Sequence, residues 1–147
     1  MGHSYCSVYL HLVFSTKERR PLIPPPKQRL LHRYLAGIAT NHNMKALEAG
    51  GMQDHIHLLI SLSPDMAVAK AVNVLKSNSS KWMRAQVRGF AWQEGYAASS
   101  VSVSALEDVA EYIRNQEQHH RKRDFAQEYI ALLKKHGIVY DPRWVLG

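Results

Sequence analysis

The stretch Asp54-His55-Ile56-His57-Leu58-Leu59-Ile60 decides the fold of this chain and points to its chemistry. Its apolar, β-branched residues predict a β-strand, in which successive side chains point to opposite faces of a sheet. His55 and His57 are therefore expected to share one face, with Ile56 on the other. Two imidazoles on one rigid strand are half of a divalent-metal site. Many such pairs are merely solvated or hydrogen-bonded, so a metal site needs a further ligand from another element.

The composition is that of an ordinary globular protein. The chain has 147 residues, of which 46% are hydrophobic and 21% charged, so we expect a single domain over residues 1–147. It has no apolar run of transmembrane length, and residues 1–5 lack the features of a signal peptide. The single Cys6 excludes an internal disulfide framework and a cysteine-rich zinc site. We expect a cytoplasmic protein that does not enter a membrane.

The charge is strongly positive. Nineteen Lys and Arg residues stand against twelve Asp and Glu, which gives a formal net charge of +7 and a sequence pI of about 9.7. A basic domain of this size is an electrostatic candidate for nucleic-acid binding. Attraction to anionic membranes, or solubility alone, are the alternatives.

The first half of the chain predicts two strands and a helix around the histidine strand. Alternating apolar residues predict a strand over 7–16, and apolar residues at helical spacing predict a helix over 27–42. A short strand over 44–49 is followed by Gly50-Gly51, which we interpret as a turn. This second strand is then expected to form a hairpin with the histidine strand.

The second half predicts mostly helix. A long helix is expected over 66–88, extended chain over 96–103 and a final helix over 125–136. Between the last two, Ser104 and Glu107 fit a capping box that opens a helix running through Gln116. The irregular order of strands and helices favours an α+β fold, an antiparallel sheet with helices packed on it.

The Ser104 helix carries a second pair of chemically useful residues. Tyr112 and Gln116 are four residues apart, so they lie on the same side of a helix. Taken alone, Tyr112 could be a core aromatic residue and Gln116 a solvated amide. The basic run over 119–123 could likewise be a solvated joint between helices.

The combination of these motifs resembles one family. His55-x-His57 on a strand and Tyr112-Ile113-x-Asn115-Gln116 on a later helix are similar to the small single-tyrosine HUH transposases of insertion sequences, and to their repetitive-element-associated tyrosine transposase relatives. The similarity extends from the strand at residues 9–17 to the tail at residues 140–144. It implies a ferredoxin-like, RRM-like fold.

The resemblance also implies a reaction. His55, His57 and Gln116 would bind one Mg²⁺ or Mn²⁺, and Tyr112 would attack a phosphodiester of single-stranded DNA at a hairpin-marked element end. The products would be a 5′-phosphotyrosine and a free 3′-hydroxyl, which can rejoin without ATP. The neutral ligands would leave the full charge of the ion for the phosphate. The Tyr112 phenol, with a reference pKa near 10, needs such help to lose its proton.

Basic and aromatic side chains supply candidates for DNA contact. Trp82 and Trp92 could stack on unpaired bases, although we favour a core position for both. His11 is expected to support the metal strand rather than to be a ligand. The candidate DNA-binding residues are Lys17, Arg19, Arg20, Lys76, Lys81, Arg84, Arg88, Arg121, Lys122 and Arg123.

Two other functions are compatible with the same residues. The chain could be a metal phosphoesterase with water as nucleophile, or a catalytically silent or domesticated protein that binds hairpin and single-stranded DNA. A cupin-type oxygenase is disfavoured because half of the chain is predicted helical. The insertion-sequence relatives imply a homodimer in which the tyrosine helix of one subunit serves the other, whereas the repetitive-element relatives act as monomers. We expect the homodimer, associated with the nucleoid of a prokaryotic cell.

Overall fold

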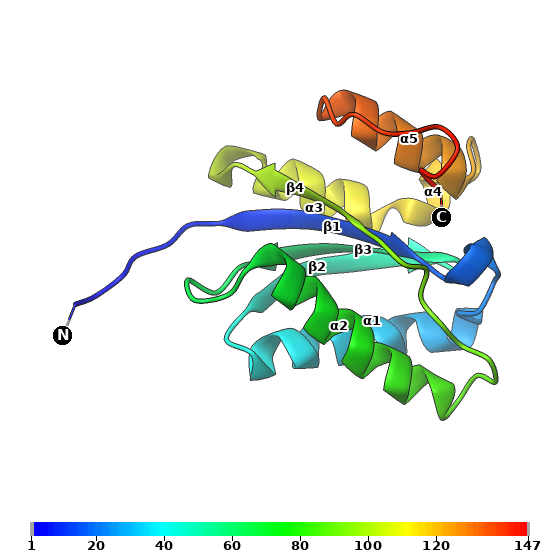
Figure 1. The fold of residues 1–147 in the computed structure, drawn as a ribbon, viewed down its shortest axis with the longest axis horizontal. Helices are drawn as coiled ribbons and strands as arrows, with labels where there is room; N and C mark the ends of the chain where they lie inside the picture. The colour runs from blue at the N-terminus through cyan, green and yellow to red at the C-terminus, as the bar shows by residue number, and fades with distance from the viewer. Residues whose placement is uncertain (1, 147) are drawn as a thin grey trace.

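The computed structural model describes residues 2–146 and consists of one sheet between two layers of helices (Figure 1). The antiparallel sheet has the strand order β2-β3-β1-β4. The order β1-α1-β2-β3-α2-β4 is that of a ferredoxin-like fold, so the predicted α+β class is confirmed. The elements are β1 (Tyr9–Ser15), 3₁₀ turn η1 (Lys17–Arg19), α1 (Pro25–Asn41), β2 (Lys45–Met52), β3 (His55–Ser61), α2 (Val68–Arg84), β4 (Ala97–Val101), 3₁₀ turn η2 (Val103–Ala105), α3 (Leu106–Arg114), α4 (Gln116–His119) and α5 (Phe125–Lys135).

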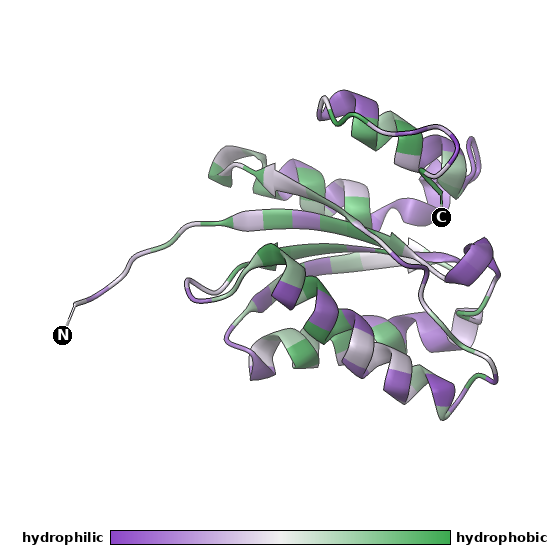
Figure 2. Ribbon diagram, viewed as in Figure 1, coloured by the Kyte–Doolittle hydropathy of each residue, from purple (hydrophilic) through white to green (hydrophobic). Residues whose placement is uncertain are grey.

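The helices α1 and α2 cover one face of the sheet, where the hydrophobic core lies (Figure 1). Ile56, Leu58 and Ile60 alternate along β3 and are completely buried in this core. Figure 2 shows α2 banded with hydrophobic and hydrophilic residues, the pattern of a helix that buries one side. The core therefore fixes the register of β3, because a slip by one residue would turn its isoleucines outward.

The helices α3, α4 and α5 cover the other face (Figure 1). There α3 approaches the sheet closely at Gly50, where an added Cβ would lie 2.1 Å from the Ile113 carbonyl oxygen. The next residue, Gly51, has φ +152°, a backbone angle that side chains disfavour. Gly50 thus lets α3 rest on the edge strand β2, whereas a Cβ at Gly51 would lie 2.2 Å from the His55 carbonyl oxygen on β3.

The hairpin of β2 and β3 is confirmed, but its predicted turn was wrong. Gly50 and Gly51 lie inside β2, and the turn is at Gln53 and Asp54. Gly50 is explained by the close contact with α3, and Gly51 by its positive φ and its closeness to the His55 backbone. The local sequence does not distinguish these tertiary features from a turn.

The predicted start and course of the tyrosine helix were also wrong. Residues 103–105 form a 3₁₀ turn, α3 begins at Leu106, and no side chain caps it. The helix then breaks at Asn115 (φ −100°, ψ 30°), so that Tyr112 and Gln116 lie on two consecutive helices. A capping box does occur, at Asp124 and Gln127 before α5.

Candidate metal and nucleophile site

His55 and His57 share the face of the sheet that α3–α5 cover, and both are completely buried. Their ring centroids lie 5.1 Å apart. Each ring is held through its Nδ1 atom: Asp54 Oδ1 lies 2.7 Å from His55 Nδ1, and His11 Nε2 lies 2.8 Å from His57 Nδ1. Such supports leave both Nε2 atoms facing the same space, as in carboxylate–histidine–metal sites. His11, on β1, therefore supports His57 from behind.

Gln116 and Tyr112 reach this space from the helical layer. The Gln116 side chain is buried, and its Oε1 lies 3.0 Å from His55 Nε2. The Tyr112 ring stacks on His119 at a centroid distance of 4.5 Å and lies 5.9 Å from the His57 ring. Although the helix breaks at Asn115, Gln116 Nε2 still donates to the Tyr112 carbonyl at 3.4 Å. The structure thus gathers all four residues of the two motifs.

Glu128, on α5, is a member of the site that the sequence analysis missed. Its side chain is completely buried, and its Oε1 lies 3.0 Å from His57 Nε2 and 3.6 Å from His55 Nε2. Its Oε2 accepts a hydrogen bond from the Tyr112 hydroxyl. The sequence pattern that could have indicated it is a glutamate three residues after Phe125, on the same side of the predicted helix.

The joint after α4 is only partly solvated. Arg121, Lys122 and Arg123 are exposed, but His119 stacks on Tyr112. His120 Nε2 lies 3.1 Å from both Gln116 Oε1 and Glu128 Oε1. The two histidines of the joint therefore belong to the walls of the site.

Burial and hydrogen bonding shift the ionisation of the site residues. Burial lowers the pKa of His57 to about 4, although Glu128 opposes the shift, and burial and His57 together lower the pKa of His11 to about 3. Burial alone would raise the pKa of Glu128, but its hydrogen bonds with His120 and His57 hold it well below its usual value. Burial and the bond to Glu128 raise the pKa of Tyr112. Burial alone would lower the pKa of His120, but its hydrogen bond with Glu128 raises it above the usual value. At neutral pH the site thus contains the Glu128 carboxylate and the neutral imidazoles of His57 and His11.

The donor atoms fit a divalent cation. One donor atom from each of His55, His57 and Glu128 lies within 4.8 Å of the others, and Gln116 Oε1 lies 3.0 Å from His55 Nε2. Ligands about 2.1 Å from a common ion lie roughly 3–3.5 Å apart, close to the 3.0 and 3.6 Å that separate Glu128 Oε1 from the two Nε2 atoms. Among residues 2–146, every ion pair of Glu128 is with a histidine. A cation at this point would compensate the buried carboxylate.

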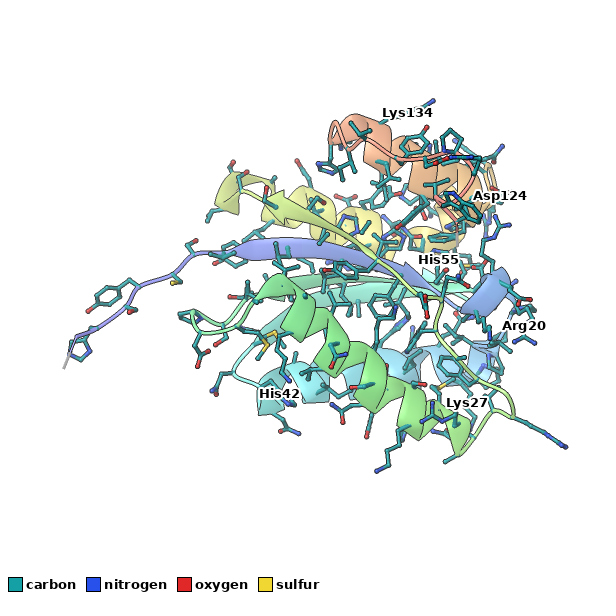
Figure 3. The ribbon with its side chains drawn as sticks, in the orientation of Figure 1. Arg20, Lys27, His42, His55, Asp124 and Lys134 are labelled. Carbon is teal, nitrogen blue, oxygen red and sulfur yellow. The ribbon has the colours of Figure 1, made fainter. Side chains whose placement is uncertain are left out.

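The candidate DNA-binding residues fall on two sides of the molecule. Figure 3 shows Arg20 near the site end that carries His55 and Asp124, whereas Lys27 lies on the far helical layer. The site-side residues lie in η1 with Arg20 and in the exposed turn before α5. The others lie on α2 or just after it: Lys81, Arg84 and Arg88 are exposed, and Lys76 Nζ donates to the Gln93 and Gly95 carbonyls at 2.6 and 2.9 Å.

Trp82 and Trp92 pack within the protein. Trp92 contacts Phe14 and Phe90 edge-on, and its Nε1 donates to Ser79 Oγ at 3.0 Å. Trp82 stacks on Tyr34 at a centroid distance of 4.5 Å. Both are partly buried against the core, as favoured from the sequence.

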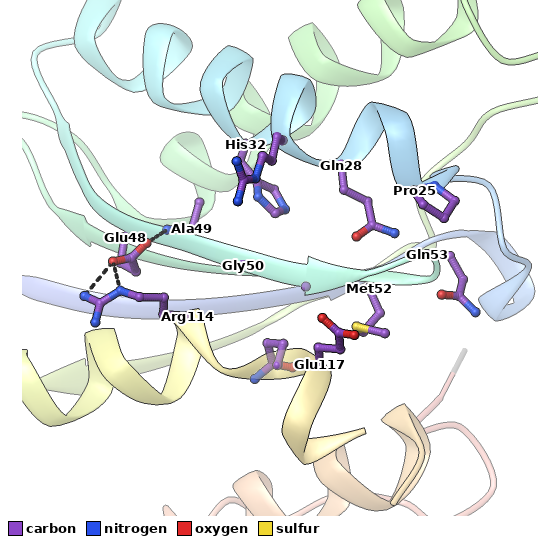
Figure 4. Close-up of a pocket in the computed structure, with 13 residues that line it drawn as sticks. Pro25, Gln28, His32, Glu48, Ala49, Gly50, Met52, Gln53, Arg114 and Glu117 are labelled. Atoms are coloured by element: carbon purple, nitrogen blue, oxygen red, sulfur yellow. Dashed lines mark hydrogen bonds and ion pairs between the residues drawn. The ribbon is translucent and has the colours of Figure 1, made fainter. Parts of the chain in front are cut away.

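A groove of about 600 Å³ adjoins the site along the β2 edge (Figure 4). It lies between α1 and the α3–α4 segment, and Gln116 is one of the residues that line it. Arg114 and Glu48 form an ion pair at 3.0 Å on its wall.

Among the described helices, none is long and apolar enough to cross a membrane.

Comparisons with known proteins identify relatives of the chain. The family model described as "Transposase IS200 like" matches residues 4–116. The transposase for insertion sequence element IS200 of Salmonella typhimurium is 29% identical over 125 residues, which cover 79% of this chain and 81% of that protein. The ISDra2 transposase TnpA of Deinococcus radiodurans is 28% identical over 123 residues, which cover 78% and 87%.

Solved structures agree in fold. A transposase structure from Deinococcus radiodurans R1 is similar with a TM-score of 0.62 and 26% identity, covering 79% of this chain and 96% of that chain. The structure of a REP-associated tyrosine transposase bound to a REP hairpin has a TM-score of 0.57 and covers 95% of this chain and 74% of that chain. At 13% identity, this second likeness concerns the fold alone.

Proposed function

This chain belongs to the IS200-like transposase family, and we propose that it cuts and rejoins single-stranded DNA through a covalent bond to Tyr112. The observation that carries the proposal is the placement of the Tyr112 hydroxyl at a carboxylate that also contacts His57. The proposed nucleophile, which is half-buried, and the proposed metal-ligand atoms thus lie in one site. This is the arrangement that phosphoryl transfer from a phosphodiester to a side chain requires.

The residues that would hold the ion are His55, His57 and Gln116, together with Glu128 Oε1. A bound Mg²⁺ or Mn²⁺ would neutralise charge on a non-bridging phosphate oxygen. Both ions accept imidazole and oxygen ligands, and the donor set does not choose between them.

The proposed cleavage forms one ester bond and breaks another. The Tyr112 oxygen forms a bond to phosphorus as the bond from phosphorus to the 3′-oxygen breaks. Overall, the phenolic proton ends on that 3′-oxygen, which becomes a free hydroxyl. The phosphotyrosine keeps the ester bond, so attack by another 3′-hydroxyl reverses the step without ATP. His119 and His57 would keep the Tyr112 ring in place during this bond exchange.

The cations near the site are proposed to bind the strand around the cut phosphate. These are Lys17, Arg19 and Arg20 in and just after η1, and Arg121, Lys122 and Arg123 before α5. The cations on α2 lie on the opposite layer of the sheet, so their DNA contacts would be remote from the cut. We propose a hairpin at the element end as the DNA feature bound, as the resemblance of the motifs to the single-tyrosine transposases implies.

The homodimer with shared sites remains a proposal. In this structure Tyr112 lies at the histidines of its own chain, so sharing would require α3–α5 to exchange between subunits. Mixing His57→Ala with Tyr112→Phe protein distinguishes the two arrangements, because only exchanged helices restore one intact site. We further expect the protein to work at the nucleoid of a prokaryotic cell.

Incubation with a labelled single-stranded oligonucleotide that carries a hairpin tests the function. We expect a metal-dependent covalent protein–DNA adduct that Tyr112→Phe abolishes. Metal-dependent cutting that survives Tyr112→Phe would instead indicate a water nucleophile. Hairpin binding with no cutting in Mg²⁺ or Mn²⁺ would indicate a catalytically silent binding protein.

A further inference from the structure

We propose that Glu128 is a positioning residue that joins the nucleophile to the metal ligands, with one carboxylate oxygen for each. The inference rests on the proposed function and adds to it an element that the family comparison leaves out. The family model matches residues 4–116, whereas Glu128 lies on α5 (Phe125–Lys135). The C-terminal helix of this chain would thus complete the site of the family.

Local structure fixes where α5 begins and which side it turns to the site. Asp124 accepts a hydrogen bond from the Gln127 backbone at 2.9 Å, and the Gln127 side chain accepts one from the Asp124 backbone at 3.0 Å. Directly after this cap, Phe125 stacks on the His55 ring with centroids 4.4 Å apart and planes at 20°. Glu128 follows three residues later on the same side of the helix, which places it over His57.

The first carboxylate oxygen, Oε1, faces the ligand atoms. It lies 3.0 Å from His57 Nε2, 3.1 Å from His120 Nε2 and 3.6 Å from His55 Nε2. It therefore occupies a position from which it can share a cation with both motif histidines.

The second oxygen, Oε2, holds the nucleophile. It accepts the hydrogen bond of the Tyr112 hydroxyl, and this is the hydroxyl's bonded partner in the structure. The Tyr112 ring is confined by His119 on its face at 4.5 Å and by His11 at 6.3 Å. The ring stacking sets where the phenol lies, and Glu128 sets where its oxygen points.

Glu128 therefore couples metal binding at the ligand atoms to the position of the Tyr112 hydroxyl. Glu128 is completely buried, and a buried carboxylate is held tightly only when its charge is compensated. A cation at Oε1 supplies that compensation and fixes Oε2 at the same time. Tyr112 should accordingly become more ordered when the metal binds, before any DNA is present.

The variant Glu128→Gln tests this coupling, because it keeps the size of the side chain and removes its charge. Glu107→Gln, an exposed glutamate in the first turn of α3, is the matched control for loss of one negative charge. In Glu128→Gln we expect the Kd for Mn²⁺, measured by electron paramagnetic resonance without DNA, to rise by at least about 10-fold. We expect the adduct to form at least about 100-fold more slowly at saturating Mn²⁺.

A second readout needs neither DNA nor activity. The aromatic resonances of Tyr112, assigned by their loss in Tyr112→Phe, should shift when Mg²⁺ is added to the wild type and to Glu107→Gln. They should not shift in Glu128→Gln. If Glu128→Gln does not fold, Glu128→Asp takes its place, because its carboxylate is one methylene too short to reach both partners.

The inference is overturned if the Tyr112 resonances of the Glu128 variant respond to Mg²⁺ as in the wild type, or if its adduct forms at the wild-type rate at saturating metal. Failure of the proposed function looks different. In that case the wild type forms no adduct under any condition, while the Mg²⁺-linked shift of Tyr112 and its loss in Glu128→Gln remain.

Discussion

The two faces of the sheet differ in what they bury. The face under α1 and α2 receives Ile56, Leu58 and Ile60 from β3 and forms the hydrophobic core. The face under α3–α5 receives His55 and His57 from the same strand, together with a buried glutamate and glutamine. Alternation along one strand thus separates the part of the molecule that stabilises the fold from the part to which we assign the chemistry.

The difference shows how a polar site can be held rigidly. Burying histidines and a carboxylate opposes folding unless they bind one another. Here the strand that carries the histidines is anchored by the apolar residues on its other face, and each imidazole is fixed through Nδ1 by Asp54 or His11. The hydrophobic core fixes the register of β3, and this register fixes the positions of the His55 and His57 side chains.

The largest effects on activity and stability should come from substituting two adjacent residues of β3 that face opposite sides of the sheet. His57→Ala removes a proposed ligand atom, and we expect adduct formation to fall by about 10³-fold or more. Leu58→Ala leaves the site face intact but should lower the free energy of unfolding by about 2–5 kcal/mol, because it opens a cavity. Chemical denaturation and single-turnover adduct assays on both variants check this. Equal losses of activity per folded molecule would refute the separation of the faces.

The next effect concerns how closely the helical layer sits on the site face. Gly50→Ala would place a methyl group against the Ile113 carbonyl, so α3 must shift and carry Tyr112 with it. We expect about 1–3 kcal/mol of destabilisation together with slower adduct formation.

Gly37→Ala is its control on the other layer. Its Cβ meets nothing within 4 Å, so the loss of backbone freedom in the unfolded chain should stabilise the protein by about 0.5–1 kcal/mol. Thermal denaturation compares the two glycine variants. Gly50→Ala protein as stable and active as the wild type would show that α3 does not need the close approach.

Acid should lower the free energy of unfolding through a buried histidine of the site face. His11 has a pKa of about 3 in the folded protein and near 6.5 when unfolded. Between pH 6.5 and pH 3, His11 is therefore protonated in the unfolded chain but neutral in the folded protein. The free energy of unfolding accordingly falls as the pH drops from 6.5 towards 3. At pH 5 the loss from this residue should be about 2 kcal/mol.

Urea denaturation of metal-free protein between pH 7 and pH 5 measures this slope. His11→Gln should show a shallower pH dependence because it removes the proton that only the unfolded chain accepts. An unchanged slope in His11→Gln would assign the acid sensitivity to other groups.

The smallest effect should distinguish the cations of the two layers. Arg123 lies in the exposed turn beside the site and influences the pKa of Tyr112, whereas Lys81 lies on α2. For a short unpaired oligonucleotide, Arg123→Ala should reduce affinity a few-fold and the salt slope of log K by about 0.7, one phosphate contact. Lys81→Ala should leave both values unchanged. Fluorescence anisotropy over a salt series measures them, and identical behaviour would mean that the strand contacts both layers.

The sequence predicted the features that depend on local pattern. The period of two in residues 54–60 correctly indicated a strand with both histidines on one face, and the neighbouring strand does form a hairpin with it. The predicted helices over 27–42, 66–88 and 125–136 occur with ends shifted by at most four residues. In these segments, burial and periodicity point to the same structure.

The errors arise where a distant segment decides. Gly50 resembles a turn residue until α3 is placed against it, and Ser104 resembles a cap although the chain forms a 3₁₀ turn there. Glu128 could not be separated from an exposed helical glutamate, since its role depends on His57, 71 residues earlier in the chain. Contacts of this kind depend on the whole fold.

The most direct test of the account is to identify the residue that joins the DNA. The wild-type protein is incubated with Mn²⁺ and a hairpin-bearing single strand, the adduct is digested with protease and nuclease, and the modified peptide is sequenced by mass spectrometry. The account predicts a phosphodiester-derived nucleotide on Tyr112 and nowhere else. Cleaved DNA with an unmodified Tyr112, or a nucleotide attached to another side chain, would contradict it.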